Sequence, residues 1–303
     1  MDGILNINKP RGMTSFGVVA IVRRLSGERR VGHAGTLDPE AIGVLPVCLG
    51  KATRIVEFLM STTKTYRAEV ELGVVTDTYD ATGKVIQRGD ISGIDRQRVE
   101  AALYAFRGEI VQVPPMFSAV KYNGRPLYEL ARAGRTVERT GRPIEIHSLE
   151  IIDWQSPMIT IEVVCGKGTY IRSLAHDLGQ TLGCGAMLQN LARLRCGLFT
   201  IEDSVTLPEL EDAFHHGQWQ KYLYSIDNVL SHWKAVTVSN ETAQAIRNGR
   251  SVEVGSEADN DDEALSELSV DSRCRAYTSD GCLLALLHFE PERGQWQPDK
   301  VFQ

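Results

Sequence analysis

The 303-residue sequence lacks long apolar runs and paired cysteines, and each absence excludes a class of protein. Its longest apolar stretches, 43–50 and 283–287, fall far short of the ~20 residues that a membrane helix requires. The opening residues show neither the apolar core of a secretory signal nor an A-x-A cleavage site, so we expect a cytoplasmic protein without a membrane partner. Six dispersed cysteines without a C-x-x-C pair predict free, buried thiols.

Nucleotide, hydrolase and metal signatures are also missing. The segment 43–51 resembles a P-loop, but six residues separate its glycines and Lys51 is followed by Ala52, which supplies no magnesium ligand. There is no G-x-S-x-G elbow, and the seven histidines form no H-x-x-x-H pair. The sequence therefore predicts neither a metal site nor a cofactor.

The net charge of −6, taken over the whole chain, argues against nucleic acid as a partner. However, residues 251–270 contain seven acidic residues and no Lys or Arg, so the other 283 residues together carry +1. We interpret 251–270 as an acidic loop. Residues 114–145, in contrast, hold six Lys or Arg residues against three acids, and they predict a local basic surface.

Strand and helix patterns alternate without a βαβ rhythm, which favours an α+β fold. Helical spacing predicts a helix over 15–25, with Thr14 or Ser15 as its N-cap, and alternation predicts a strand over 65–74. Asn240 is the expected N-cap of a later helix. Further helices are expected at 96–106, 126–133, 171–183 and 241–248, and strands at 144–154, 158–165 and on both sides of 279–281. From about 233 onward, short strands predict a small β domain.

Three segments are dense in residues that line active sites. Asp38 lies in a glycine-punctuated loop, where a rigid carboxylate can act as a nucleophile or base, although a turn or N-cap aspartate has the same pattern. Tyr66 lies on a strand face, where it would either stack on a base or pack in the core. Arg172 follows a predicted strand at the start of a helix, where it would pair with a carboxylate or remain on the surface.

Together these segments resemble the TruB family of pseudouridine synthases. The resemblance covers nearly the whole chain through motifs in the family's order. These are Asn8–Ser15, Gly32–Pro39, Lys64–Arg67, Pro114–Lys121 with Tyr128, Ala131 and Arg132, Gly168–Leu174, Gly183–Ala186 and Leu191–Arg195. It implies a pseudouridine synthase fold with a central mixed, largely antiparallel sheet in residues 1–232. It also implies a small β-barrel (PUA-like) RNA-binding domain in 233–303, interrupted by the acidic stretch 251–270.

The resemblance also assigns roles to individual residues. Asp38 matches the catalytic aspartate, Tyr66 a tyrosine that stacks on the base and is proposed to assist proton removal from C5, and Arg172 the partner of the aspartate. The remaining matches concern substrate binding: Tyr170 and Leu191 line the target-base pocket, His33 holds the opened RNA loop, and 114–143 is an RNA clamp. We expect Lys9, Arg54, Lys64, Lys121 and Arg132 to contact RNA, with a structural role or ordinary surface exposure as alternatives for Lys9, Arg54 and Lys64.

The implied reaction isomerises uridine 55 in the T stem-loop of tRNA without redox change or net hydrolysis, which agrees with the missing cofactor motifs. Asp38 could attack C1′, attack C6, or remove the 2′ proton, and the sequence does not choose among these routes. One alternative function is a tRNA-folding chaperone in which chemistry is secondary. Another is a guide-RNA-dependent synthase, which the clamp-like segment 114–143 disfavours. We expect a monomer that needs no guide RNA.

Overall fold

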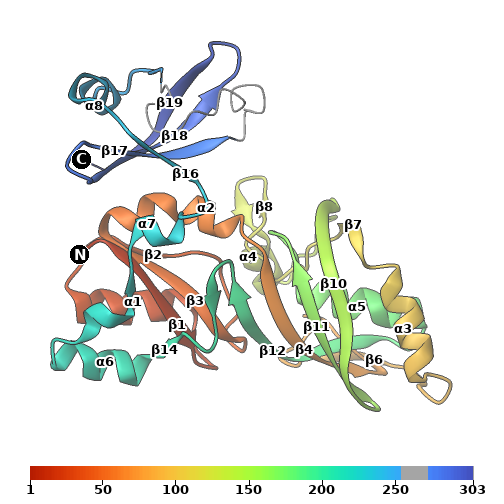
Figure 1. Ribbon diagram of the computed structural model, residues 1–303. Helices are drawn as coiled ribbons and strands as arrows, with labels where there is room; N and C mark the ends of the chain where they lie inside the picture. The colour runs from red at the N-terminus through yellow and green to blue at the C-terminus, as the bar shows by residue number, and fades with distance from the viewer. Residues whose placement is uncertain (254–271, 303) are drawn as a thin grey trace.

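A large mixed sheet forms the body of the protein, and a smaller sheet lies at its C-terminal end (Figure 1). The computed structural model describes residues 1–253 and 272–302, so most of the predicted acidic loop at 251–270 lies outside the described residues. Within them, the main sheet follows the order β14-β1-β3-β12-β4-β11-β10-β7. Only β1/β14 and β12/β3 pair in parallel, which confirms the expected mixed, largely antiparallel sheet.

The elements of the body have the following bounds. The main path comprises β1 (Gly3–Lys9), β3 (Ile42–Leu49), β4 (Lys64–Leu72), β7 (Gly108–Gln112), β10 (Arg142–Gln155), β11 (Met158–Cys165), β12 (Ala186–Cys196) and β14 (Val205–Thr206). Beside it lie β2 (Val31–His33), β13 (Phe199–Thr200), β15 (Leu223–Tyr224) and the pairs β5 (Val74–Thr76) with β6 (Val85–Arg88) and β8 (Lys121–Tyr122) with β9 (Arg125–Pro126). The helices are α1 (Ser15–Ser26), η1 (Gly50–Ile55), α2 (Val56–Met60), α3 (Arg96–Tyr104), α4 (Leu127–Arg132), α5 (Ile171–Leu182), α6 (Leu207–His215), η2 (Trp219–Tyr222) and α7 (Ile226–Val229).

Local sequence signals account for the ends of α1 and α5. The Thr14 hydroxyl accepts the Gly17 N–H at the start of α1, and Gly27 ends that helix in the left-handed conformation. Gly183 ends α5 in the same way. Both helices were predicted, α1 from its apolar spacing, and both bury an apolar face in the main core.

Strand β4 confirms the alternation seen in the sequence. Its even-numbered residues from Tyr66 to Leu72 are buried, while Arg67 and Glu69 point outward. Because β4 lies between β12 and β11, its inner face belongs to the main core. This central position carries Tyr66 deep into the body.

The C-terminal part forms an open sheet in the described residues, whereas a closed barrel was expected. It contains β16 (Lys234–Thr237), α8 (Asn240–Arg247), β17 (Arg273–Tyr277), β18 (Leu283–Glu290) and β19 (Gln295–Val301). The sheet order β16-β17-β18-β19 does not return to its first strand, although an isolated antiparallel bridge joins Trp296 of β19 to Val252. The sheet packs on the body because Leu286 of β18 and Phe302, which follows β19, join a hydrophobic cluster with Ile55 and Leu59.

Two smaller expectations need correction. The N-cap of α8 is Ser239 rather than Asn240, because the Ser239 hydroxyl accepts the N–H of Thr242. Five cysteines are free and buried as predicted, but Cys282 is exposed because it directly follows the turn that joins β17 to β18. None of the helices in the described ranges is long and apolar enough to cross a membrane.

Candidate active site

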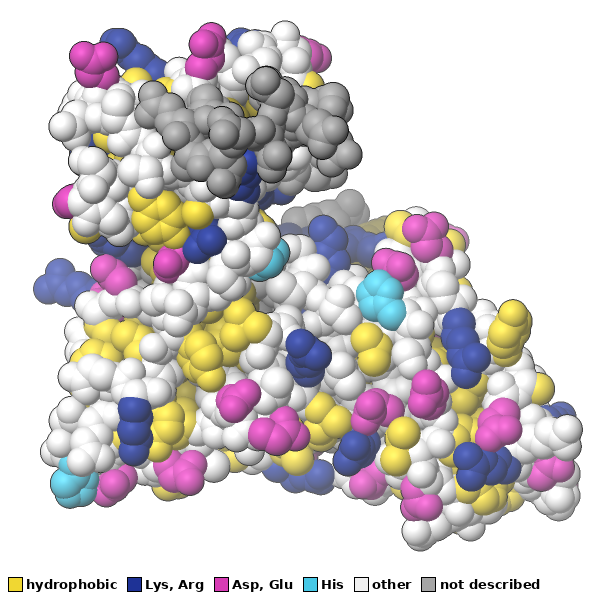
Figure 2. Space-filling model, viewed as in Figure 1, with side chains coloured by type: hydrophobic (Ala, Val, Ile, Leu, Met, Phe, Trp, Pro, Cys, Tyr) yellow, Lys and Arg dark blue, Asp and Glu magenta, His cyan; other side chains and the backbone are white. Residues whose placement is uncertain are grey.

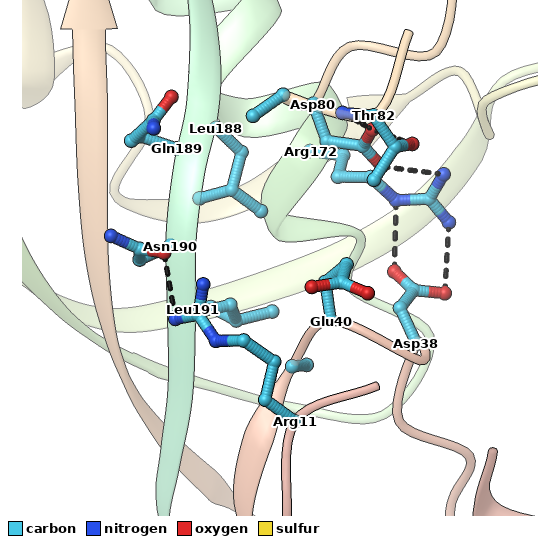
Figure 3. Close-up of a pocket in the computed structure, with 12 residues that line it drawn as sticks. Arg11, Asp38, Glu40, Asp80, Thr82, Arg172, Leu188, Gln189, Asn190 and Leu191 are labelled. Carbon is cyan, nitrogen blue, oxygen red and sulfur yellow. Dashed lines mark hydrogen bonds and ion pairs between the residues drawn. The ribbon is translucent and has the colours of Figure 1, made fainter. Parts of the chain in front are cut away.

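A pocket opens where five segments that are distant in the sequence converge, among them the loop after β1 that carries Arg11 (Figure 3). Asp38 comes from the loop after β2, Arg172 from the first turn of α5, Leu191 from β12 and Asp80 from the turn between β5 and β6. Three predicted site residues, Asp38, Arg172 and Leu191, therefore line one cavity. The complete lining is Arg11, Asp38, Glu40, Ala41, Asp80, Ala81, Thr82, Arg172, Leu188, Gln189, Asn190 and Leu191.

Arg172 holds Asp38 through a two-point ion pair. Its Nε lies 2.9 Å from Asp38 Oδ2, and its Nη2 donates to Asp38 Oδ1 at 3.1 Å. A planar guanidinium that meets a carboxylate at both oxygens fixes the orientation of that carboxylate as well as its charge. The Arg172 side chain is 6% exposed and the Asp38 side chain is 43% exposed. The arginine is therefore buried, while the carboxylate that it holds is open to the pocket.

Two carboxylates share the guanidinium. Arg172 Nη1 lies 3.5 Å from Asp80 Oδ2, and Nη2 also donates to the backbone oxygen of Phe117 at 2.9 Å. Desolvation raises the pKa of Asp38 above its ordinary value, and the negative charge of Asp80 adds to this effect, while Arg172 opposes it. The sequence suggested only the opposing effect of Arg172, because the second carboxylate was not identified.

Asp80 is the functional candidate that sequence reasoning missed, since none of the motifs described above includes it. Its Oδ1 accepts hydrogen bonds from the hydroxyls of Thr78 and Thr82 and from the Thr82 N–H. Backbone hydrogen bonds in both directions between this turn and Leu188 attach it to β12. A density of acids and hydroxyls in the turn was the available signal, but nothing local in the sequence related it to Arg172.

A stacked aromatic pair supports the same turn from the other side. Tyr79, which has a positive φ of 66°, stacks on His176 with the ring centroids 3.8 Å apart. His176 lies four residues after Arg172, so both project from one side of α5. The turn that carries Asp80 is therefore fixed to the helix that carries Arg172.

The loop that carries Asp38 is attached to the chain around the start of α1. The Ser15 hydroxyl accepts the Leu37 N–H at 2.9 Å and donates to the Leu37 oxygen at 3.1 Å. The Gly12 N–H donates to Pro39 O. Lys9 is fully buried, and its Nζ donates to the backbone oxygens of Pro10, Met13 and Pro39. These bonds on both sides of Asp38 hold its backbone in place.

Lys9 gives a prediction about stability and pH. Burial lowers its pKa from 10.5 to about 8, so between these values the unfolded chain binds more protons than the folded one. The free energy of unfolding of the wild type should therefore rise with pH between about 8 and 10.5, by up to ~1.4 kcal/mol per unit relative to Lys9→Met. Urea unfolding of both proteins at pH 7.5 and 9.5 measures this difference, and equal pH dependence would contradict it.

Strand β12 approaches β3 unusually closely beside the pocket. A Cβ at Gly43, whose φ is +101°, would lie 2.3 Å from the backbone oxygen of Arg193, so this position requires glycine. The Arg193 side chain is 1% exposed and donates to the backbone oxygens of Val44 and Gly35. This buried cation connects β12 to β3 and to the loop before Asp38, and it brings Leu191 to the pocket wall.

Tyr66, Tyr170 and His33 lie outside the pocket lining. Tyr66 is 9% exposed, and burial raises the pKa of its hydroxyl, which keeps the phenol protonated at neutral pH. Tyr170 precedes α5, and its backbone N–H and oxygen bond to the side chain of Gln112. His33 ends β2, where burial lowers its pKa and its ring meets Phe16 edge to face.

The five predicted basic contacts divide into two groups. Lys9 and Lys64 are buried with their amines on backbone oxygens, which matches the structural alternative rather than RNA contact. Arg54 is exposed and donates to the Val301 oxygen in the C-terminal part. Lys121 and Arg132 are exposed in the segment 114–143, where Arg132 lies over the ring of Tyr128. No group of three His, Cys, Asp or Glu side chains suited to a metal ion occurs in the described ranges.

Comparison with known proteins gives consistent family matches. The model of the TruB family pseudouridylate synthase N-terminal domain matches residues 23–171, and that of the tRNA pseudouridylate synthase B C-terminal domain matches 172–231. A tRNA pseudouridine synthase B from Dehalococcoides mccartyi is 44% identical over the whole chain and 97% of the relative. Another, from Clostridium tetani, is 40% identical over 92% of this chain and 93% of its own length.

Solved structures agree at the level of the fold. A chain of a Cbf5-Nop10-Gar1 complex superposes with a TM-score of 0.75 at 27% identity, over 99% of this chain and 85% of that one. A chain of an archaeal box H/ACA sRNP Nop10-Cbf5 complex gives 0.71 at 26% identity, over 99% and 86%. The expected pseudouridine synthase fold is thereby confirmed. With sequence relatives above 40% identity along its whole length, the chain belongs to the TruB family of pseudouridylate synthases.

Proposed function

We propose that this chain is a tRNA pseudouridine synthase that converts uridine 55 of the T loop, with Asp38 acting on a flipped-out nucleotide. The observation that carries the proposal is the two-point ion pair between Asp38 and Arg172 in a pocket whose wall includes Leu191. The curated relatives named tRNA pseudouridine synthase B support tRNA as the substrate. Extruding a base into a pocket costs a few kcal/mol, which contacts with the protein must offset.

The reaction is an isomerisation whose atoms balance without a second substrate. The N1–C1′ bond breaks, the uracil turns within the pocket, C5 bonds to C1′, C5 loses its proton and N1 gains one. Asp38 starts this sequence as a carboxylate by attack at C1′, by attack at C6, or by removal of the 2′ proton. In every route Arg172 orients the carboxylate, and the apolar Leu191 limits movement of the detached uracil.

The other predicted site residues contribute from behind or beside the pocket. Tyr66, whose buried phenol has a raised pKa, stacks on the base and takes part in removal of the C5 proton. Tyr170 borders Arg172 at the start of α5, and His33 holds the opened RNA loop. Asp80 is a second carboxylate at Arg172, 3.5 Å from its Nη1, and its negative charge raises the pKa of Asp38.

We assign RNA binding to the segment 114–143 and to the C-terminal residues 233–303. The root of the first is joined to the site because the Phe117 oxygen accepts from Arg172 and the Val113 oxygen accepts from Ser173. On the face shown in Figure 2, acidic and basic side chains are mixed over the body rather than gathered by sign. We place the phosphate contacts on the basic residues of the segment 114–143, among them Lys121 and Arg132.

A single-protein enzyme is favoured over a guide-dependent one. The relatives at 40–44% identity are named as tRNA pseudouridine synthases, whereas the Cbf5-containing complexes are only 26–27% identical. We therefore propose that the chain acts without guide RNA, and we keep the sequence-based expectation of a cytoplasmic monomer without a cofactor.

The direct test is incubation of the purified chain with unmodified tRNA, followed by mapping of pseudouridine along the RNA. Product at position 55 without any added RNA or protein is expected, and a tRNA with cytidine at that position should give none. Absence of product in the guide-free reaction, or product only elsewhere in the tRNA, would overturn the proposal.

The basic segment gives a prediction about salt. The double variant Lys121→Ala/Arg132→Ala should weaken tRNA binding and reduce the slope of log Kd against log salt by up to roughly 1.4–1.8, because each lost phosphate contact removes ~0.7–0.9. Fluorescence titration at several salt concentrations measures the slope. The control Arg24→Ala/Arg96→Ala removes two exposed arginines that pair with glutamates elsewhere, and it should leave the slope nearly unchanged.

Asp80 gives a prediction about pH. Because its charge raises the pKa of Asp38, Asp80→Asn should lower that pKa and move the acid limb of the kcat profile to lower pH. The pH dependence of single-turnover rates measures this shift. A shift to higher pH would show that Asp80 acts on Arg172 in some other way.

A further inference from the structure

Phe16 is an apolar residue whose side chain nevertheless lies exposed on the surface. Its side chain is 75% exposed, and no other large hydrophobic residue in the described ranges is more exposed. It occupies the first turn of α1, where the neighbouring Ser15 and Val18 are buried. Because the exposed ring does not pack in the hydrophobic core, it is free to contact another molecule. Which molecule it can contact depends on where the ring lies in the fold.

The ring forms a pair with His33. The two centroids are 5.8 Å apart and the planes meet at 88°, an edge-to-face arrangement. This geometry leaves most of the Phe16 ring open for a third flat group. His33 is itself half-buried, and its Nδ1 is buried without a hydrogen-bond partner among the described residues, so the imidazole is held in place by packing.

The pair is held close to Asp38. Ser15, adjacent to Phe16, makes two hydrogen bonds with Leu37, which is adjacent to Asp38. Lys9 further connects Met13 and Pro39 by donating to both backbone oxygens. The open ring is therefore placed next to the loop at which a target nucleotide would enter, on backbone that these bonds make rigid.

We propose that Phe16, backed by His33, stacks on an unpaired base next to the flipped uridine of the substrate RNA. This inference rests on the proposed function, because it names a second contact for the same substrate. An RNA loop that loses one base from its stack leaves a neighbouring base with an open face, and an aromatic side chain can cover that face whatever the base identity. Phe16 is thus a binding residue rather than a catalytic one.

The test compares variants on a T stem-loop RNA. Phe16→Ala should raise Kd and KM by about ten-fold, which is equivalent to about 1.4 kcal/mol. The single-turnover rate constant at saturating enzyme should change by less than about two-fold. Phe16→Trp should retain tight binding, whereas Phe16→Leu should not restore it because it keeps apolar area without a π face. Since Phe16 is exposed, its loss leaves no cavity. The control Tyr104→Ala removes a 73% exposed aromatic from α3 and should leave Kd unchanged.

A second measurement separates this inference from the proposed function. The RNA carries 2-aminopurine in place of the base adjacent to the target uridine, and stacking is detected as fluorescence quenching without any turnover. If the wild type quenches the fluorescence and Phe16→Ala does not, the result supports stacking by Phe16 even if no pseudouridine forms. Equal quenching and Kd in both proteins, or full rescue by Phe16→Leu, would overturn it while leaving guide-free product formation intact as evidence for the function.

Discussion

The Asp38→Asn variant should lose pseudouridine formation by at least roughly 10³-fold, the scale for removing a group that acts directly at the reacting atoms. The amide preserves shape and keeps an oxygen for Arg172, but it removes the negative charge that all three chemical routes require. The fold should be retained because the Asp38 side chain is 43% exposed and Arg172 keeps its contacts with Asp80 and Phe117. Single-turnover assays with tRNA labelled at uridine 55 measure the loss.

The same variant distinguishes catalysis from tRNA remodelling. Its tRNA Kd should stay within about three-fold of the wild type, since neither the segment 114–143 nor Phe16 is altered. Asp153→Asn, the same chemical change on an exposed part of β10 outside the pocket, should be fully active. Asp38→Asn with more than a tenth of wild-type activity would remove Asp38 from its proposed role. Full restoration of tRNA folding by the inactive variant would assign the larger role to the chaperone function.

The Arg172→Gln variant should lose both activity and stability. Asp38, Asp80 and the Phe117 oxygen would lose the cation that they share. The free energy of unfolding should therefore fall by roughly 2–4 kcal/mol. This loss is smaller than the loss expected for a fully buried ion pair, because Asp38 is partly exposed. Activity should fall by about 10²-fold or more because Asp38 would no longer be held in position. Urea unfolding and single-turnover rates measure the two effects.

The remaining activity of Arg172→Gln should also have a different pH dependence. Arg172 lowers the pKa of Asp38, so its removal should raise that pKa and move the acid limb to higher pH, opposite to the shift expected for Asp80→Asn. If Arg172→Gln does not fold, the variant Arg172→Lys tests the same role of the arginine. It keeps the charge but not the two-point geometry, so it should recover stability more than activity. A fully active Arg172→Lys would contradict the positioning role.

Local patterns in the sequence predicted some of the elements, but not the neighbouring strands β1, β3 and β12 of the main sheet. The spacing of Val18, Val22 and Leu25 predicted α1, and the alternation from Tyr66 to Leu72 predicted β4, because burial of one face imposes these periods. The ordered motifs then identified the family, and with it Asp38, Arg172 and Leu191 as residues of one site. Domain limits at 232 and the clamp at 114–143 stay predictions.

Contacts between distant segments could not be read in the same way. Asp80 and Arg172 are 92 positions apart, and their meeting depends on the Tyr79–His176 stack and on hydrogen bonds to Leu188. Lys9 and Lys64 have the charge expected of RNA contacts, but the fold buries both amines among backbone oxygens. Whether a lysine faces RNA or the interior is decided by neighbours that no local window contains.

The sequence by itself therefore determined part of the secondary structure through short-range periodicity, and its ordered motifs identified the family. The resemblance to that family, rather than periodicity, proposed Asp38 and Arg172 as the central carboxylate and its partner. Only the tertiary structure decided that one guanidinium serves two carboxylates, that Arg193 lies buried between β12 and β3, and that Phe16 stands open beside the Asp38 loop. The physical reason is that ion pairing, desolvation and exposure depend on distances in space, which chain separation does not fix.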